Sequence, residues 1–111
     1  MNGFNRGDVV LVDLGMTAKV RPCVVVSVGL PDSQRNMSVV VPMTTEIRGG
    51  ECEVQFAKPP WLRQVSVVNV LGIAGVDNFR IEPRVAVFSA EKLAEIESVL
   101  KRILGLSSQG P

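Results

Sequence analysis

The stretch KVRPCVVVS, residues 19–27, passes from two cations and a proline directly into a run of apolar, mostly β-branched residues. β-branched side chains are restricted at χ1 and favour strands. Proline disfavours helical backbone at the residue before it, so Pro22 forces Arg21 into an extended conformation. The stretch therefore predicts a strand over residues 22–28, with Arg21 held on a rigid base at its start.

Similar apolar runs lie on both sides of this strand. DVVLVDL at residues 8–14 has apolar residues on both faces, which is typical of a strand that is buried on both sides. Turn-forming sequences, such as GLPDSQRN at residues 29–36 and EIRGG at 46–50, separate the runs. We expect strands over residues 8–14, 22–28, 37–41 (closed by Pro42), 51–56, 65–71 and 85–88. Five or six short strands with close turns favour a small β-barrel over an open sheet.

The period of the apolar residues changes near the C-terminus. Ser89 is placed to cap a helix whose second position is Glu91, and Gly105 is a natural stop. Between them, apolar residues recur at three- and four-residue spacing: Leu93, Ile96, Leu100, Ile103 and Leu104. The fold class is therefore mainly β with one C-terminal α-helix. We expect a single domain over residues 1–106 and an unstructured tail over 107–111.

The composition restricts the possible functions. The chain has 111 residues, of which 46% are hydrophobic and 21% charged, enough for one compact domain. A formal net charge of +1 argues against a protein that coats duplex nucleic acid, so any anion site must be local. The chain has no histidine, which excludes His-dependent triads, His-metal hydrolases and ribonuclease sites that use paired histidines.

The N-terminus and the cysteines indicate the compartment. MNGFNRGD lacks the basic and apolar regions of a secretion signal, and no apolar run approaches the ~20 residues that span a bilayer. We therefore expect a cytoplasmic protein with no membrane partner. Cys23 and Cys52 have neither CxxC spacing nor a nearby histidine, so we expect reduced, packed thiols rather than a disulfide, and no metal site.

Two interpretations of the role of Arg21 are open at this point. Its guanidinium is a planar fork of donors that suits phosphate oxygens and keeps its charge at any physiological pH. It could equally be a surface charge, or an ion pair with Asp8 or Asp13. A second stretch, VVVPMTTEIRGG at residues 39–50, leaves a strand and enters two consecutive hydroxyls, Thr44 and Thr45. Such hydroxyls are often simple turn formers.

The combination of four segments resembles a known family. RGDVVLVDLG at residues 6–15, VRPCVVVS at 20–27, VVVPMTTE at 39–46 and FSAEKLAEIESVLKRILGL at 88–106 together are similar to the MazF/PemK family of toxin-antitoxin ribonucleases. The resemblance covers most of the chain, in the expected order. It implies an SH3-like barrel with a helix, a homodimer, and metal-independent, cofactor-free cleavage of single-stranded mRNA at short sequences.

The resemblance also implies roles for individual residues. The arginine of the family's RP motif falls on Arg21, and the threonine that assists catalysis falls on Thr44. In the implied mechanism, the substrate 2′-hydroxyl attacks the adjacent phosphorus and leaves a 2′,3′-cyclic phosphate and a 5′-hydroxyl. Arg21 would stabilise charge on the phosphoryl oxygens and Thr44 would donate a hydrogen bond to the same group. A cognate antitoxin, with an acidic and initially disordered tail, would cover the groove that contains Arg21.

Further residues are candidates for substrate binding or proton transfer. We expect substrate contacts from Lys19, Thr45, Glu46, Arg48 and Asn69. An arginine is a poor base because its pKa is above ~12, so the general base could be Glu46, Asp13 or water.

Two segments differ from the family pattern. The connection GMTAKV at residues 15–20 is short. A Gln-x-Arg segment is absent from residues 66–76, where Gly72 and Ala74 stand and Asn69 is the polar group nearby.

The loop that contains PPWL adds three residues with open interpretations. Lys58 and Arg63 could join the other cations in following a short RNA backbone, but each alone fits a solvated surface charge. Trp61 could stack on a base, or cover the edge of the barrel or a dimer contact. Two other functions remain as alternatives to a ribonuclease: a non-enzymatic gyrase-binding toxin of the CcdB type, and a catalytically silent SH3-like binding module.

Overall fold

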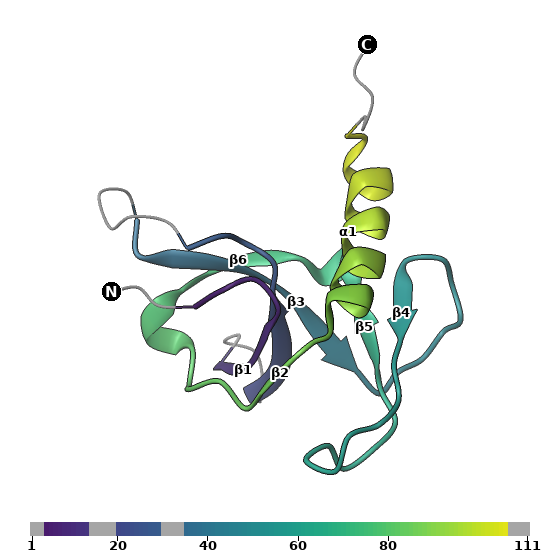
Figure 1. Ribbon diagram of the computed structural model, residues 1–111, viewed down its shortest axis with the longest axis horizontal. Helices are drawn as coiled ribbons and strands as arrows, with labels where there is room; N and C mark the ends of the chain where they lie inside the picture. The colour runs from purple at the N-terminus through teal and green to yellow at the C-terminus, as the bar shows by residue number, and fades with distance from the viewer. Residues whose placement is uncertain (1–3, 14–19, 30–34, 107–111) are drawn as a thin grey trace.

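The computed structural model describes residues 4–13, 20–29 and 35–106. In that part of the chain, short strands form one curled sheet of seven, and a single α-helix follows them (Figure 1). The elements are β1 (Asp8–Asp13), β2 (Val20–Val25), β3 (Met37–Thr44), β4 (Glu53–Gln55), β5 (Val67–Asn69), the 3₁₀-helix η1 (Val70–Gly72), β6 (Ala74–Asp77), the 3₁₀-helix η2 (Asn78–Arg80), β7 (Ala86–Val87) and α1 (Ala90–Leu104).

β3 is the strand that joins the two parts of the sheet. The strand order is β4-β5-β3-β2-β1-β7, and every pairing is antiparallel. The first half of β3 pairs with β6, whereas its last two residues pair with β5. Because the strand changes partner along its length, the sheet curls into a half-barrel (Figure 1). The predicted small SH3-like barrel with a C-terminal helix is confirmed.

Several strand boundaries differ from the prediction. β2 begins at Val20 and ends at Val25, and β4 and β5 are each three residues long. β3 does not end before Pro42 but continues to Thr44. Proline has no N–H to donate, and it is tolerated here because the β6 ladder ends at Val40 and the β5 ladder begins at Met43. Pro42 therefore lies between two ladders on that edge of β3.

β6 is the strand that the sequence pattern did not predict. Its sequence, AGVD, has neither an apolar run nor a clear alternation, and only Val76 is buried. The segment is extended because four of its residues pair with Met37–Val40 of β3. Its structure depends on this long-range pairing and not on local propensity.

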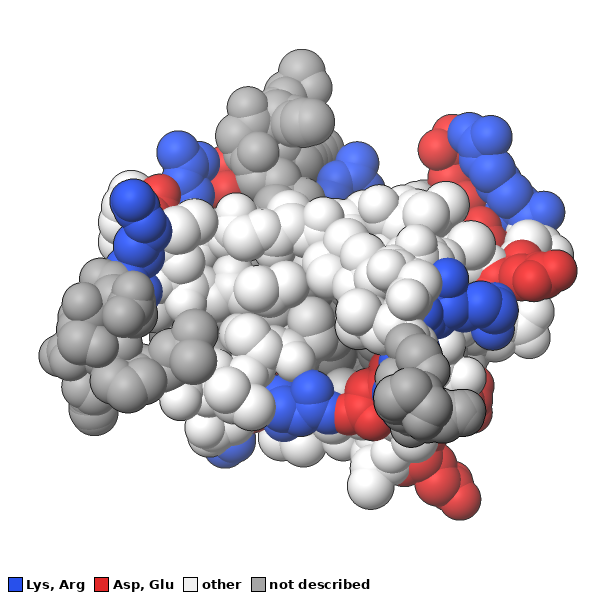
Figure 2. Space-filling model, turned by 90° about the horizontal axis from the view of Figure 1, so that it is seen from above, with Lys and Arg blue, Asp and Glu red and all other residues white. Residues whose placement is uncertain are grey.

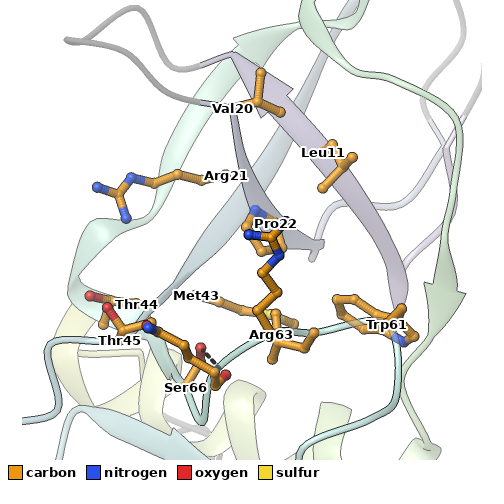
Figure 3. Close-up of a pocket in the computed structure, with 12 residues that line it drawn as sticks. Leu11, Val20, Arg21, Pro22, Met43, Thr44, Thr45, Trp61, Arg63 and Ser66 are labelled. Atoms are coloured by element: carbon orange, nitrogen blue, oxygen red, sulfur yellow. Dashed lines mark hydrogen bonds between the residues drawn. The ribbon is translucent and has the colours of Figure 1, made fainter.

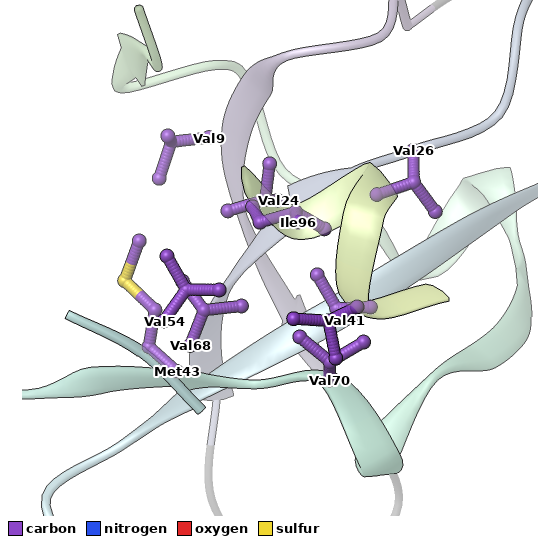
Figure 4. Close-up of a cluster of buried hydrophobic side chains, with 10 residues drawn as sticks. Val9, Val24, Val26, Val41, Met43, Val54, Val68, Val70 and Ile96 are labelled. Carbon is purple, nitrogen blue, oxygen red and sulfur yellow. The ribbon is translucent and has the colours of Figure 1, made fainter. Parts of the chain in front are cut away.

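Apolar side chains cover both faces of the sheet. One cluster lies between the sheet and the helix (Figure 4) and consists of Val9, Val24, Val26, Val41, Met43, Val54, Val68, Val70, Ile96 and Val99. The other consists of Val10, Val12, Cys23, Val25, Val40, Val76 and Ile81. β1 contributes to both, which confirms that this strand is buried on both sides. Cys23 is buried, Cys52 is partly buried and both are free thiols, as predicted.

α1 has the caps that the sequence indicates. The Ser89 hydroxyl accepts a hydrogen bond from the backbone N–H of Lys92 at 3.1 Å, and Gly105 ends the helix with φ of 71°. The predicted apolar face is correct except at its end, because Leu104 is 52% exposed and Val99 is buried instead. The Arg6 side chain connects the helix to the sheet. It forms an ion pair with Glu97 of α1, and its Nη1 donates a hydrogen bond to the Val26 carbonyl at 2.9 Å.

The surface carries charges of both signs. Seen from above the view of Figure 1, lysines and arginines lie around the rim of the molecule beside acidic residues, and the centre of that face is uncharged (Figure 2). This face therefore has no continuous basic surface, as the net charge of +1 predicts. Among the described residues, no helix combines the length and hydropathy needed to cross a bilayer.

Candidate functional site

The register between β2 and β3 brings Arg21 and Thr44 together. The last residue pair of the β2–β3 ladder is Cys23 with Pro42. If the same register continues for two more residues, Arg21 lies opposite Thr44. Residues directly opposite each other in an antiparallel pair point to the same face, with Cβ atoms about 4.5–5.5 Å apart in a regular ladder. Figure 3 shows the guanidinium of Arg21 and the side chains of Thr44 and Thr45 on the same side of one pocket.

The Arg21 side chain is exposed and forms no ion pair with any described residue. The predicted alternative, an ion pair between Arg21 and Asp8, is wrong. Asp8 is buried, and its Oδ1 lies 3.7 Å from the Nη1 of Arg84. Its Oδ2 accepts a hydrogen bond from the backbone N–H of Asn5 at 2.9 Å. Asp13, at the exposed end of β1, has Val20 as its Cα partner, one residue from Arg21. The guanidinium is therefore available to an anion that enters the pocket.

Thr44 is half-buried at the end of β3, and its hydroxyl is held in place from one side. The Thr44 Oγ1 accepts a hydrogen bond from the backbone N–H of Glu46 at 3.0 Å. A threonine hydroxyl has one O–H and two acceptor positions. With its oxygen already used as an acceptor, its O–H remains able to donate to a ligand.

A pocket of about 750 Å³ lies beside these two residues. Loops and strand ends from four parts of the chain line it: Leu11, Val20, Arg21, Pro22, Met43, Thr44, Thr45, Trp61, Leu62, Arg63, Gln64 and Ser66. Arg21 and Arg63 are its cations, and none of the described lining residues is acidic. Arg63, like Arg21, has no ion-pair partner among the described residues. The positive charge is therefore local, as expected for a chain of nearly zero net charge.

A second pocket of about 440 Å³ adjoins the first at Thr44, which lines both. Its walls are Thr44, Glu46, Arg48, Gly50, Glu51, Cys52, Glu53, Asn69 and Leu71. The carboxylate of Glu53 accepts from the backbone N–H groups of Arg48 and Gly49 at 3.0 and 2.8 Å, which fixes the loop after β3. Because three carboxylates line this pocket, its charge differs from that of the first.

The predicted site residues fall into three groups. Arg21, Thr44 and Thr45 line the first pocket, whereas Glu46, Arg48 and Asn69 line the second, with Thr44 in common. Lys19 and most of the short connection at residues 15–20 lie outside the described residues, as does the tail at 107–111. Of the two carboxylates considered as a base, Glu46 faces the second pocket and lies 3.6 Å from Arg48.

The loop between β4 and β5 supplies further residues of the first pocket; the sequence named Trp61 and Arg63 as possible RNA contacts but did not name Gln64 and Ser66. Trp61 and Arg63 line it together with Gln64 and Ser66, whereas the Lys58 Nζ donates to the Leu62 carbonyl at 2.8 Å within the loop. Local sequence patterns cannot show that these residues meet Thr44, because the loop lies about twenty positions after Thr44 in the chain. The tryptophan and the arginine that follow two prolines in this loop were the available signal.

Gly72 stands where the family pattern has a polar side chain, and the structure gives a reason. A Cβ built on Gly72 would lie 2.7 Å from the Pro42 Cγ and 3.2 Å from the Asn69 Nδ2. Any side chain at this position would therefore displace the proline ring of β3, two residues before Thr44. Asn69 remains the polar side chain on this side of the second pocket.

Cys23, on the same strand as Arg21, is not a nucleophile. Burial raises the pKa of its thiol from 9.0 to about 12, although the nearby charge of Arg21 opposes the shift. A thiol with that pKa stays protonated at neutral pH, and the thiolate is the reactive form. The Cys23 Sγ lies 3.7 Å from the Arg21 carbonyl, so the thiol instead supports the backbone of the arginine.

Comparisons with known proteins agree on one family. Residues 5–104 match a family model described as PemK-like, MazF-like toxin of type II toxin-antitoxin system. No curated protein matches the chain. Among solved structures, MazF in a MazE–MazF complex from Deinococcus radiodurans is similar over 94% of this chain and 98% of that chain, with a TM-score of 0.78 and 26% identity.

Two mycobacterial structures share the fold. An endoribonuclease from a Mycobacterial species, in complex with its cognate antitoxin, has a TM-score of 0.79 and 23% identity over 95% of this chain and 98% of that chain. The Mycobacterium tuberculosis toxin MazF-mt6 has a TM-score of 0.77 and 19% identity over 90% and 98%. At these identities the likeness concerns the fold.

Proposed function

Because the chain belongs to the PemK-like, MazF-like toxin family of type II toxin-antitoxin systems, we propose that it is an endoribonuclease that cleaves single-stranded mRNA at Arg21 and Thr44. The observation that carries the proposal is the meeting of an unpaired guanidinium and a free O–H at one pocket without described acidic residues. None of the comparisons supports the gyrase-binding alternative. The proposed substrate is mRNA, so the cytoplasm is the proposed location.

The role proposed for Arg21 follows from the charge that develops during cleavage. When the 2′-hydroxyl of RNA attacks the adjacent phosphorus, negative charge grows on the non-bridging oxygens before the 5′-oxygen leaves. A guanidinium can donate two parallel hydrogen bonds to two such oxygens. The backbone of Arg21 is already held at the start of β2, which reduces the reorganisation needed during the reaction.

Thr44 is proposed to donate to one of the same oxygens. Its own oxygen is tethered by the Glu46 backbone N–H at 3.0 Å, which directs the O–H away from the loop. The two donors come from neighbouring strands, so the sheet sets their separation. Removal of one such donor typically costs about 10²–10³ in rate.

The remaining predicted contacts are proposed to hold RNA beyond the scissile phosphate. Thr45 stands beside Thr44, and Arg48 and Asn69 line the adjoining pocket; Lys19 precedes Arg21 in the chain. For proton transfer, Glu46 is displaced into the adjoining pocket and is 75% exposed. Asp13 lines neither pocket, so water fits the role of base better than either carboxylate.

Two partners are proposed on the basis of the family. MazF of D. radiodurans was solved with MazE, and we propose a cognate antitoxin that covers the pocket of this chain as well. An acidic segment would complement Arg21 and Arg63. A homodimer is also proposed, since large apolar side chains including Leu71 and Val87 are 64% and 59% exposed.

The test of the proposed function is cleavage of a long single-stranded RNA by the purified protein in EDTA, with mapping of the cut ends. Discrete sites with 5′-hydroxyl ends are expected. Uncut RNA, or cleavage that requires an added metal ion, would contradict the proposal.

Matched variants test the assignment of the two donors. Arg21→Ala and Thr44→Val should each lose about 10²–10³ in kcat/KM. Arg80→Ala is the control, because that arginine lies over the ring of Phe79, at 5.8 Å from its centroid, and does not line either pocket. If Arg21→Ala cleaves as fast as Arg80→Ala, the assignment of Arg21 is wrong.

A further inference from the structure

Trp61 forms part of the wall of the first pocket, opposite the side where Thr44 and Thr45 lie. In Figure 3 the indole is at one end of the pocket, the two threonines are at the other, and Arg63 extends between them. The tryptophan is 38% exposed although it is the largest apolar side chain of the protein. A partly exposed aromatic side chain that lines a pocket is a surface on which a planar group can stack.

The loop that carries Trp61 is stiff. Pro59 and Pro60 fix two φ angles directly before it. The Lys58 Nζ donates to the Leu62 carbonyl at 2.8 Å, and the Leu62 N–H donates to the Pro59 carbonyl at 3.1 Å. These bonds hold the backbone of Trp61 in place before any ligand binds, which lowers the entropy cost of stacking on its side chain.

The charges around the indole favour an anionic planar ligand. Neither Arg21 nor Arg63 has an ion-pair partner among the described residues, and no described acidic residue lines this pocket. A single nucleic-acid strand carries one phosphate and one planar base per nucleotide. Such a strand fits this arrangement of two guanidinium groups and one aromatic side chain. An apolar partner protein would leave both guanidinium groups without counter-charge.

We propose that Trp61 stacks on a nucleobase of the bound RNA, and that Arg63 binds a phosphate neighbouring the one held by Arg21 and Thr44. The proposal rests on the proposed function and deepens it, because it assigns the loop between β4 and β5 to substrate binding. Stacking has little base preference, so this loop contributes affinity and register, and the choice of sequence is made elsewhere.

The protein provides its own probe for this proposal, since Trp61 is its single tryptophan and it has no tyrosine. The experiment titrates the full-length protein with a 2′-O-methyl RNA oligonucleotide that spans a mapped cleavage site. The 2′-O-methyl group removes the nucleophile, so binding is observed without cleavage. Tryptophan fluorescence should be quenched in a saturable manner, with the same dissociation constant that anisotropy of the labelled oligonucleotide gives.

Variants separate stacking from a general loss of structure. Trp61→Ala should bind about 5- to 150-fold more weakly and raise KM more than it lowers kcat, while Trp61→Phe should recover most of the affinity. The matched control is Phe79→Ala, which removes an aromatic ring that is 80% exposed and outside both pockets. It should bind RNA as the parent does.

The salt dependence of binding tests Arg63. Each phosphate contact to a single strand contributes about 0.7 to the slope of log K against log salt concentration. Arg63→Ala should therefore lower the slope by roughly that amount, and Arg80→Ala should leave it unchanged. An unchanged slope in Arg63→Ala would refute the phosphate contact.

The possible failures can be told apart. If RNA is cleaved in EDTA but saturating oligonucleotide leaves the fluorescence unchanged, and Trp61→Ala binds like the parent, the stacking proposal is wrong and the proposed function stands. If fluorescence changes on dilution of the protein alone and Trp61→Ala is monomeric, Trp61 belongs to a contact between copies, and the proposal is also wrong. Absence of any cleavage refutes the proposed function independently.

Discussion

Replacement of Gly72 by alanine is expected to destabilise the protein and to slow cleavage. The added Cβ would lie 2.7 Å from the Cγ and 3.0 Å from the Cδ of Pro42. A proline ring cannot rotate away as a flexible side chain can, so either η1 or β3 has to move. Insertion of one methyl into such a tight contact typically costs about 1–3 kcal/mol.

The same displacement would reach the site. Pro42 is two residues before Thr44 in β3, and a shift of this strand changes the distance between the Thr44 hydroxyl and the Arg21 guanidinium. We therefore expect kcat to fall more than KM rises, because the two donors act on the transition state.

Urea denaturation measures the stability, with Gly75→Ala as the matched control. A Cβ at Gly75 would meet only the Met37 Cε at 3.7 Å, an ordinary contact, so this variant should be as stable as the parent or slightly more so. With a urea dependence of about 1–3 kcal/mol/M, the midpoint of Gly72→Ala should fall by roughly 1 M. Equal midpoints for the two alanine variants would refute the close contact between η1 and β3.

Two further predictions concern the core and the buried thiol. Ile96→Ala should destabilise the protein by about 2–5 kcal/mol in urea denaturation, because the side chain is fully buried between α1 and the sheet. Leu104→Ala, at a position 52% exposed on the same helix, should stay within about 0.5 kcal/mol of the parent, and a similar loss in both would contradict the packing. Burial raises the pKa of the Cys23 thiol from 9.0 to about 12, so the unfolded chain loses this proton first. The stability that the protonated thiol contributes is complete below pH 9 and declines as the pH rises toward 12. Unfolding free energies of the parent, Cys23→Ala and Cys52→Ala should therefore show this alkaline decline in the first and third only; a decline of equal size in all three would disprove the assignment to Cys23.

The elements with strong local patterns were predicted closely. The caps at Ser89 and Gly105 fix α1 within one residue, because capping depends on side chains and glycine geometry at those positions alone. The apolar run of β1 gave a strand buried on both sides. β6 was not predicted, since its extended backbone depends on pairing with a strand that lies more than thirty residues earlier.

The candidate site was predicted in part for the same reason. Arg21, Thr44 and Thr45 are found at one pocket because each stands at a strand end that a proline or a turn marks in the sequence. Glu46, Arg48 and Asn69 line the adjoining pocket, which the one-dimensional pattern could not distinguish from the first. Gln64 and Ser66 were missed, because a loop has no period that indicates which of its side chains face a ligand.

The sequence by itself determined most of the strands, though not β6, together with the helix and the chemistry that each strand end carries. Local rules were sufficient, because backbone stiffness, proline and capping act over a few residues. Only the tertiary structure decided that Arg21 faces Thr44, that a separate pocket holds Glu46 and that Trp61 joins the site from another loop. These facts depend on the register of β2 on β3 and on the curl of the sheet, where pairing and packing bring together residues that are distant along the chain.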